Sequence, residues 1–250
     1  MSGRIRAVVF DYGHTIVDFR RTEEALLDAY GQIRDRIEAA LEIEAPEVGH
    51  LIDRVANEVD RLVAASYEDR RMEELDPLRV FEEVLNRALG LSVPPDVVGH
   101  IVALDHSAFS NTIVVSEENL GVLRDLKERG HLLGLVSNVT LLPDLMRADI
   151  AALRIGELLD AALFSSEVGT RKPDPRIFRT MLERLGVQPN DAVFVGDRLL
   201  DDIGGAQGVG MRAVLTQEFR KEEPDGDVHP DAVIGRLPEL PAALERLAAA

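Results

Sequence analysis

Four short, almost uninterrupted apolar stretches constrain the fold of this 250-residue chain more than any other feature of its sequence. They cover residues 5–10, 132–136, 192–195 and 212–215, and a weaker stretch of the same kind covers 161–164. Stretches of this length, rich in Val, Leu and Phe and separated by helical segments, are typical of strands buried on both faces of a parallel sheet. The sequence therefore predicts an α/β fold built on a parallel sheet.

The segments between the later strands carry the start and stop signals of helices. Ser116, followed by two glutamates, predicts a helix that ends at Gly130. Asp174, followed by a proline, predicts another helix that ends at Gly186. A capping side chain satisfies free N–H groups, acid or proline suits the first turn, and glycine suits the end of a helix. Strands and helices are therefore expected to alternate in this part of the chain.

Residues 18–108, between the first and second strands, contain no strand-like stretch. Their apolar residues recur with helical spacing, which predicts four helices. These helices are expected to begin near Thr22, Leu51, Asp76 and Pro95. An insert of this length is too long for a loop. We therefore expect a helical domain at 18–108 and a catalytic core made of residues 1–17 and 109–250.

Charge and the absence of cysteine narrow the possible partners and chemistry. The chain carries 28 Lys and Arg against 45 Asp and Glu, a net charge of −17, and no Cys. Such an excess of negative charge repels nucleic-acid backbones and anionic membrane surfaces, so we expect neither as a partner. Without cysteine, thiol nucleophiles, Cys-ligated zinc and disulfides are excluded. With no signal sequence and no apolar run of membrane-spanning length, we expect a cytoplasmic protein.

Polar residues follow the predicted strands at the end where parallel sheets bind ligands. Asp11 follows the first strand, Ser137 and Asn138 follow the second, Asp197 follows the strand at 192–195 by one glycine, and Lys172 lies in the loop after 161–164. Carboxylates suit Mg²⁺, a hydroxyl can donate to a phosphoryl oxygen, and an ammonium group can neutralise phosphoryl charge. A carboxylate can also attack phosphorus to form an acyl phosphate. The set indicates chemistry on a phosphoryl group.

Four motifs, in this order along the chain, resemble motifs one to four of the haloacid dehalogenase superfamily of hydrolases. They are VVFDYGHT at 8–15, GLVSN at 134–138, RKPDP at 171–175 and FVGDRLLDDIGGA at 194–206. The resemblance implies a Rossmann-like core with strand order 5-4-1-2-3. It also implies subfamily I, in which a helical cap of the C1 type closes over the site and selects the substrate.

The resemblance implies a role for each residue that matches a motif. Asp11 would be the nucleophile, and Lys172 would bind the phosphoryl group beside it. The remaining substrate-binding residues would be Ser137, Asn138 and Thr15, with Thr15 also bracing the first loop. The ligands of a Mg²⁺ ion would be Asp11, the carbonyl of Gly13, Asp197 and Asp202. The implied substrate is a small phosphorylated metabolite, bound by a monomer or a homodimer.

One position departs from the pattern of the family's phosphatases. These enzymes usually carry a second aspartate two residues after the nucleophile, which protonates the leaving group, but this chain has Gly13 there. General acid–base catalysis is worth about 10²–10⁴ in rate, so slow phosphatase turnover is expected. We hypothesise that His14 supplies the proton, because imidazole titrates near neutral pH and His14 flanks the gap. Leaving groups of low pKa would need no acid.

The missing aspartate leaves more than one function open. Phosphonatases use a cap lysine, but Lys127, Lys172 and Lys221 all lie outside 18–108, which disfavours that branch. We expect a Mg²⁺-dependent hydrolase of a small phosphate monoester that works through an aspartyl phosphate at Asp11. A metal-independent dehalogenase-like hydrolase is the first alternative, although the acidic fourth motif favours a metal. The second alternative is a catalytically weak protein that binds a phosphorylated ligand or a protein.

Overall fold

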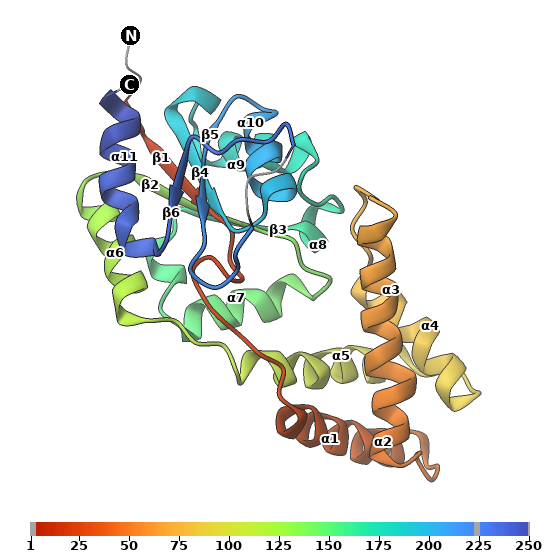
Figure 1. Ribbon diagram of the computed structural model, residues 1–250. Coiled ribbons are helices and arrows are strands. Elements are labelled where there is room, and N and C mark those ends of the chain that lie inside the picture. Colours follow the sequence, from red (N-terminus) through yellow and green to blue (C-terminus); the bar gives the residue numbers. More distant parts are fainter. Residues whose placement is uncertain (1–3, 223–225, 250) are drawn as a thin grey trace. The chain divides into compact units, whose positions relative to one another are not determined.

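A six-stranded parallel sheet forms the centre of the structure's α/β part (Figure 1). The computed structural model describes residues 4–222 and 226–249. The strands are β1 (Ala7–Phe10), β2 (Leu132–Ser137), β3 (Ala161–Phe164), β4 (Ala192–Gly196), β5 (Arg212–Thr216) and β6 (Ala232–Ile234). Their order is β3-β2-β1-β4-β5-β6. The predicted α/β class and the order 5-4-1-2-3 are confirmed, and β6 extends the sheet beyond β5.

Helices cover both faces of the sheet (Figure 1). On one face, apolar residues of β1 such as Val9 pack with Phe178 and Met181 of α9 (Pro175–Leu185). The short helix α10 (Gly205–Gln207) packs against α9 on the same side. On the other face lie α6 (Glu117–Glu128) and α11 (Leu240–Ala249), which contact each other. β1 and β4 are buried at every position, which explains their unbroken apolar sequence.

The helix signals of the sequence act as predicted. The Ser116 side chain accepts a hydrogen bond from Asn119 N at the start of α6, and the Asp174 side chain accepts one from Arg176 N at the start of α9. At the end of α9, Gly186 takes a φ of 62°, a left-handed conformation that glycine adopts without strain. The predicted boundaries of both helices are confirmed.

Helices form the second part of the structure. They are α1 (Glu23–Leu41), α2 (Val48–Leu51), the π-helical η1 (Ile52–Ala56), α3 (Asn57–Glu68), α4 (Pro77–Leu89) and α5 (Pro95–Ser110). Thr22 caps α1 and Asp76 caps α4, as their positions in the sequence predict. Apolar residues such as Ile33, Phe81 and Ile101 form a hydrophobic core of this part alone. The α2, η1 and α3 segments follow one another directly, where the sequence predicts a single second helix.

The chain divides into two compact units. Unit 1 comprises Met1–Asp18, Val114–Val139 and Ile150–Ala250, and unit 2 comprises Phe19–Ile113 and Thr140–Asp149. This division differs from the expected boundaries in placing Asp18 with the core, and 109–113 and 140–149 with the helices.

Contacts within unit 2 explain the assignment of the second segment. Leu142 and Leu145 pack against the core of unit 2, and His106 Nε2 lies 2.7 Å from Asp149 Oδ2. Both residues of that pair are well buried, with side-chain exposures of 6% and 12%. Segment 140–149 is thus tied to the helices by apolar and polar contacts together.

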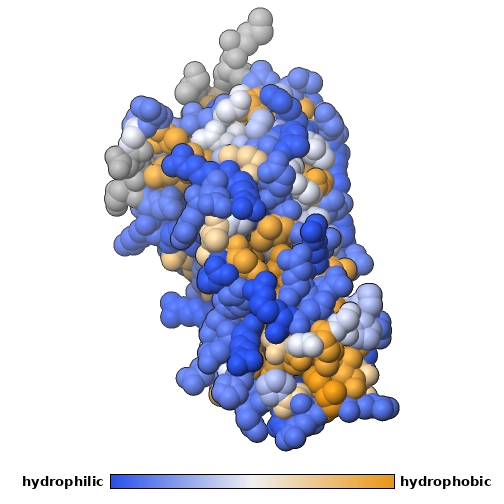
Figure 2. Space-filling model, turned by 90° about the vertical axis from the view of Figure 1, so that its right-hand side faces the viewer, coloured by the Kyte–Doolittle hydropathy of each residue, from blue (hydrophilic) through white to orange (hydrophobic). Residues whose placement is uncertain are grey.

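The surface is hydrophilic over much of the view in Figure 2. Hydrophilic residues predominate on the face drawn in Figure 2, with hydrophobic groups in smaller areas between them. Within 4–222 and 226–249, no helix is both long enough and apolar enough to cross a lipid bilayer.

Candidate active site

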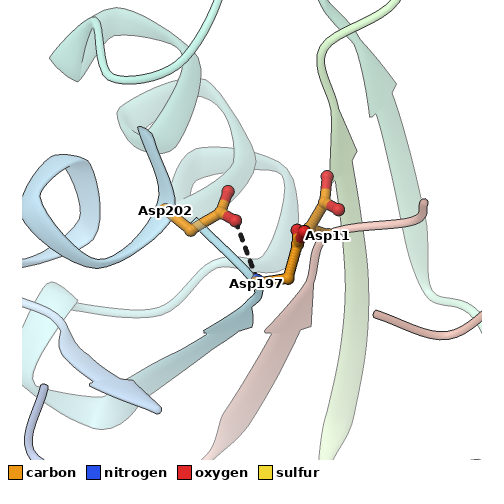
Figure 3. Close-up of side chains that lie close together, drawn as sticks. All are labelled: Asp11, Asp197 and Asp202. Atoms are coloured by element: carbon orange, nitrogen blue, oxygen red, sulfur yellow. Dashed lines mark hydrogen bonds between the residues drawn. The ribbon is translucent and has the colours of Figure 1, made fainter. Parts of the chain in front are cut away.

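Three buried carboxylates converge at the carboxyl ends of the central strands. Asp11 directly follows β1, Asp197 directly follows β4, and Asp202 lies in the π-helical η4 (Leu199–Gly204) (Figure 3). One carboxylate oxygen from each residue lies within 4.8 Å of the others. Their exposures are 7%, 2% and 1%. Oxygen atoms grouped in this way are the ligands that hard divalent cations prefer.

The sheet register accounts for the meeting of Asp11 and Asp197. β1 and β4 are adjacent and parallel, with Phe10 opposite Val195, so the residues that follow emerge side by side. Asp11 N donates a hydrogen bond to Val195 O at 2.9 Å, which continues the ladder to the first residue of the site. The pairing of two neighbouring parallel strands is therefore enough to bring these two carboxylates together.

A glycine makes room for the third carboxylate. Oδ2 of Asp202 accepts a hydrogen bond from the backbone N of Asp197 at 3.1 Å (Figure 3). It accepts a second from the backbone N of Arg198 at 3.0 Å. A Cβ atom on Gly196 would lie 2.4 Å from the Asp202 carboxylate, closer than non-bonded atoms approach. The glycine of the fourth motif is therefore required by the close approach of Asp202.

Lys172 connects two of the carboxylates. Its Nζ donates to Asp11 Oδ1 at 2.6 Å and to Asp202 Oδ1 at 2.7 Å, and its side chain is 2% exposed. Asn138, which follows β2, fixes the lysine's backbone: Lys172 N donates to Asn138 Oδ1 at 2.7 Å, and Asn138 Nδ2 donates to Lys172 O at 3.0 Å. Asn138 therefore positions Lys172.

Burial and mutual repulsion shift the pKa values of the cluster. Burial raises the pKa of Asp11 to about 7, with Asp202 and Asp197 adding to the rise and Lys172 opposing it. Burial and the charge of Asp202 raise the pKa of Asp197 to about 6. Burial alone would lower the pKa of Lys172, but the attraction of Asp11 and Asp202 outweighs it and raises that pKa above its usual range. Burial and the neighbouring carboxylates thus both disfavour the charged forms of Asp11 and Asp197.

The first loop contains the remaining predicted residues. Gly13 pairs with Val17 through an isolated β-bridge, and His14 takes a φ of 59°, in the left-handed region that few non-glycine residues adopt. His14 Nδ1 lies 3.2 Å from Asp18 Oδ1. Thr15 is fully buried, and its Oγ1 has no hydrogen-bond partner among the residues that the structure describes.

The structure thus brings together four of the predicted residues. They are Asp11, Lys172, Asp197 and Asp202. Ser137 is the last residue of β2, 4% exposed, beside Asn138. The His14 ring contacts Asp18, which lies outside the carboxylate cluster.

Arg220 is a site residue that sequence reasoning missed. Its Nε lies 2.7 Å from Asp197 Oδ2, in the loop that follows β5. The rule that polar residues after strand ends form the site applies to β5 as well as to the other strands. Arg220 stands four residues beyond Thr216, however, so no adjacent signal in the sequence marks it.

Comparisons with known proteins identify the family of the chain. A family model described as haloacid dehalogenase-like hydrolase matches residues 5–210. A glyceraldehyde 3-phosphate phosphatase of Methanopyrus kandleri is 31% identical over 249 residues, which cover 98% of this chain and 99% of that protein.

Two solved structures resemble nearly the whole chain. The crystal structure of a HAD phosphatase from Thermococcus onnurineus is 26% identical, with a TM-score of 0.61, and the match covers 96% of this chain and 97% of that one. A 2-haloacid dehalogenase from Pseudomonas syringae is 27% identical, with a TM-score of 0.68 and coverage of 97% and 99%. The protein belongs to the haloacid dehalogenase-like hydrolases.

Proposed function

We propose that this protein is a Mg²⁺-dependent phosphatase of a small phosphate monoester, with Asp11 as the nucleophile. The observation that carries the proposal is the buried cluster in which Lys172 bridges Asp11 and Asp202 while Asp197 completes a set of three carboxylates. A cluster of this composition provides a nucleophile, a phosphoryl-binding cation and metal ligands within one small volume.

The donor set fits a divalent cation. Its atoms are all oxygens, and the cluster is shielded from water. The pKa values of Asp11 and Asp197 are raised by burial and by neighbouring carboxylates, so a cation would relieve the repulsion. We propose that Asp11, Asp197, Asp202 and the Gly13 carbonyl hold Mg²⁺, which would stabilise charge on the phosphoryl oxygens.

The chain's own residues carry the remaining chemistry. An oxygen of Asp11 attacks phosphorus, the bond from phosphorus to the ester oxygen breaks, and the leaving oxygen takes up a proton. Water then attacks phosphorus in the acyl phosphate, which releases inorganic phosphate and regenerates the Asp11 carboxylate. Lys172 opposes the burial-driven rise in the pKa of Asp11 and neutralises phosphoryl charge, and Ser137 donates its hydroxyl proton to a phosphoryl oxygen.

Because Gly13 has no side chain that could protonate the leaving group, another donor must supply this proton. We propose His14, which lies in the same loop and has a side chain that is 26% exposed. Asp18 orients its ring through Nδ1.

The substrate class follows from the relatives. The similarity to the Methanopyrus protein extends over nearly both chains, so a phosphorylated three-carbon sugar is the first substrate that we propose to test. A panel of small phosphate esters should include glyceraldehyde 3-phosphate beside phosphoserine, and the cap role of residues 18–108 remains a prediction.

The test is phosphate release from p-nitrophenyl phosphate, whose leaving group needs no acid. Wild type and Asp11→Asn are assayed with Mg²⁺ and with EDTA, and Asp144→Asn, a change at a side chain that is 99% exposed, serves as the control. We expect activity that requires both Mg²⁺ and Asp11 and that is unaffected in the control. Activity that persists in EDTA or in Asp11→Asn would contradict the proposal.

A dehalogenase is the second candidate, and a specific observation favours it. The chain lacks the second aspartate at Gly13, and it resembles the Pseudomonas 2-haloacid dehalogenase over nearly its whole length. In that case Asp11 would displace halide from carbon, and water would then hydrolyse the ester. Halide release from a short 2-haloacid in EDTA, with no phosphate release from any ester, would establish this function. Tight Mg²⁺-dependent phosphate binding without turnover would instead identify a binding protein.

A further inference from the structure

Arg220 is a cationic residue that none of the four motifs includes, and it lies against a proposed metal ligand. Its Nε is 2.7 Å from Oδ2 of Asp197, whose side chain is 3% exposed. We propose that Arg220 is a resident counter-cation that competes with the divalent cation at Asp197 and thereby sets the metal affinity of the site. This inference rests on the metal site proposed above.

Arg220 and Asp197 form an ion pair without an aligned hydrogen bond. Neither Arg220 Nε nor Asp197 Oδ2 has a hydrogen-bond partner in the described part of the chain, although the two atoms are 2.7 Å apart. The N–H bond is therefore not aimed at the oxygen, and a lone pair of Oδ2 stays open to a metal ion. The Arg220 side chain is 35% exposed, so its guanidinium group can move into water without repacking the core.

The loop that carries Arg220 is held on both sides of this residue. Before it, Oε2 of Glu218 accepts a hydrogen bond from Leu237 N at 2.7 Å. After it, Oε2 of Glu222 accepts one from Leu199 N, also at 2.7 Å, at the start of η4. The side chains of Glu218 and Glu222 thus tie the loop to η5 (Leu237–Glu239) and to η4, which carries Asp202, and so hold this part of the chain beside the cluster.

The two cations of the site pair with different carboxylates, and Arg220 pairs with one of them. Lys172 bonds to Asp11 and Asp202, and Arg220 pairs with Asp197. A divalent cation that binds Asp197 meets the positive guanidinium group nearby. Because like charges a few ångströms apart repel even near a protein surface, the cation binds more weakly than the three carboxylates alone would allow.

The test measures Mg²⁺ binding directly, by isothermal titration calorimetry on the full chain without substrate. Arg220→Gln removes the charge and Arg220→Lys retains it. Lys221→Gln is the matched control, because it makes the same change in net charge at the adjacent, exposed residue. We expect Kd for Mg²⁺ to fall about tenfold in Arg220→Gln and to stay near the wild-type value in the other two variants. The difference should shrink when the salt concentration is raised, because salt screens the repulsion.

The outcomes separate this inference from the proposed function. If the wild type binds Mg²⁺ and Arg220→Gln binds it equally or more weakly, Arg220 does not compete, and the inference is overturned while the metal site stands. An equal gain in Lys221→Gln would also overturn it, because the effect would then belong to net charge. If neither the wild type nor any variant binds Mg²⁺, the metal site fails and the inference fails with it.

Discussion

The Lys172 ammonium group lies 2.6 Å from a carboxylate oxygen of Asp11, and both side chains are buried. The same ammonium group reaches Asp202, and its backbone is fixed on both sides by Asn138. The proposed nucleophile is therefore held by a cation whose own position is set by Asn138, the residue that follows the neighbouring strand β2. This arrangement restricts which cation can replace Lys172.

Lys172→Arg is expected to retain the charge but lose the geometry. The planar guanidinium group is larger and cannot occupy the space between Asp11 and Asp202 without displacing one of them. A misplacement of about 1 Å near the reacting atoms costs about 10² in rate, so we expect kcat for p-nitrophenyl phosphate to fall at least that far. Circular dichroism and thermal unfolding of the same variant provide the control. Wild-type kcat in Lys172→Arg would show that charge alone suffices.

Asp11→Asn is expected to stabilise the metal-free protein at high pH. The pKa of Asp11 is about 7 in the folded protein, above its ordinary value of 3.8, so the folded state binds this proton more tightly than the unfolded state does. The stability of the wild type therefore falls as pH rises from about 4 to 7 and stays reduced above that range. Asparagine cannot ionise, and the variant avoids this loss.

Thermal unfolding in EDTA measures this effect. We expect Asp11→Asn to unfold about 3–5 °C above the wild type at pH 8 and the difference to shrink at pH 5, where Asp11 is protonated. Adding Mg²⁺ at pH 8 should raise the wild-type Tm more than that of the variant, because binding to the folded state stabilises it. A variant that is less stable than the wild type at pH 8 in EDTA would contradict the raised pKa.

Gly196→Ala tests the close approach that places Asp202. The new Cβ would lie 2.4 Å from the Asp202 carboxylate, and the whole side chain would have to move. Overpacking of this kind costs about 1–3 kcal/mol of unfolding free energy. We expect that loss together with weaker Mg²⁺ binding by calorimetry. Gly31→Ala, at a helical glycine whose added Cβ meets nothing within 4 Å, is the control that should retain metal binding.

The five longer strands, and the polar residues that follow them, were predictable because the sequence pattern that marks each of them is local. A buried parallel strand has an unbroken apolar sequence, and the residues at its carboxyl end are read directly after it, as with Asp11 after β1 and Asp197 near β4. β6 escaped prediction because it has three residues and the Val233 side chain within it is 45% exposed. A strand at the edge of the sheet is not buried on all sides, so its sequence lacks the unbroken apolar stretch that marks the inner strands.

Features that depend on distant contacts could not be predicted. Arg220 belongs to the site because Glu218 and Glu222 fix its loop to other segments, and single-sequence patterns do not report such bonds. Segment 140–149 groups with the helices through contacts such as that between His106 and Asp149, forty-three positions apart. The sequence gives no periodic signal for either relationship.

Gly13→Asp is expected to restore the missing proton donor. If turnover is limited by protonation of the leaving group, the added carboxyl group should raise kcat/KM for alkyl phosphates by about 10–10² and leave p-nitrophenyl phosphate nearly unchanged, because nitrophenolate departs without a proton. Comparing the two esters in the same variant controls for changes in folding or metal binding, which would affect both. Equal changes for both esters would show that position 13 acts on the metal site instead.

His14→Ala tests whether the imidazole already supplies that proton. We expect a fall of about 10–10² in kcat/KM for alkyl phosphates and loss of the basic limb of their pH profile, since an acid catalyst must be protonated to act. Hydrolysis of p-nitrophenyl phosphate should again be nearly unaffected.

The φ of 59° at His14 complicates a simple truncation, because alanine is as strained there as histidine. His14→Gln, which retains a polar side chain of similar length but cannot transfer a proton, is therefore the matched variant. Normal rates for alkyl phosphates in both variants, with an unchanged pH profile, would exclude His14 as the acid and leave water as the proton source.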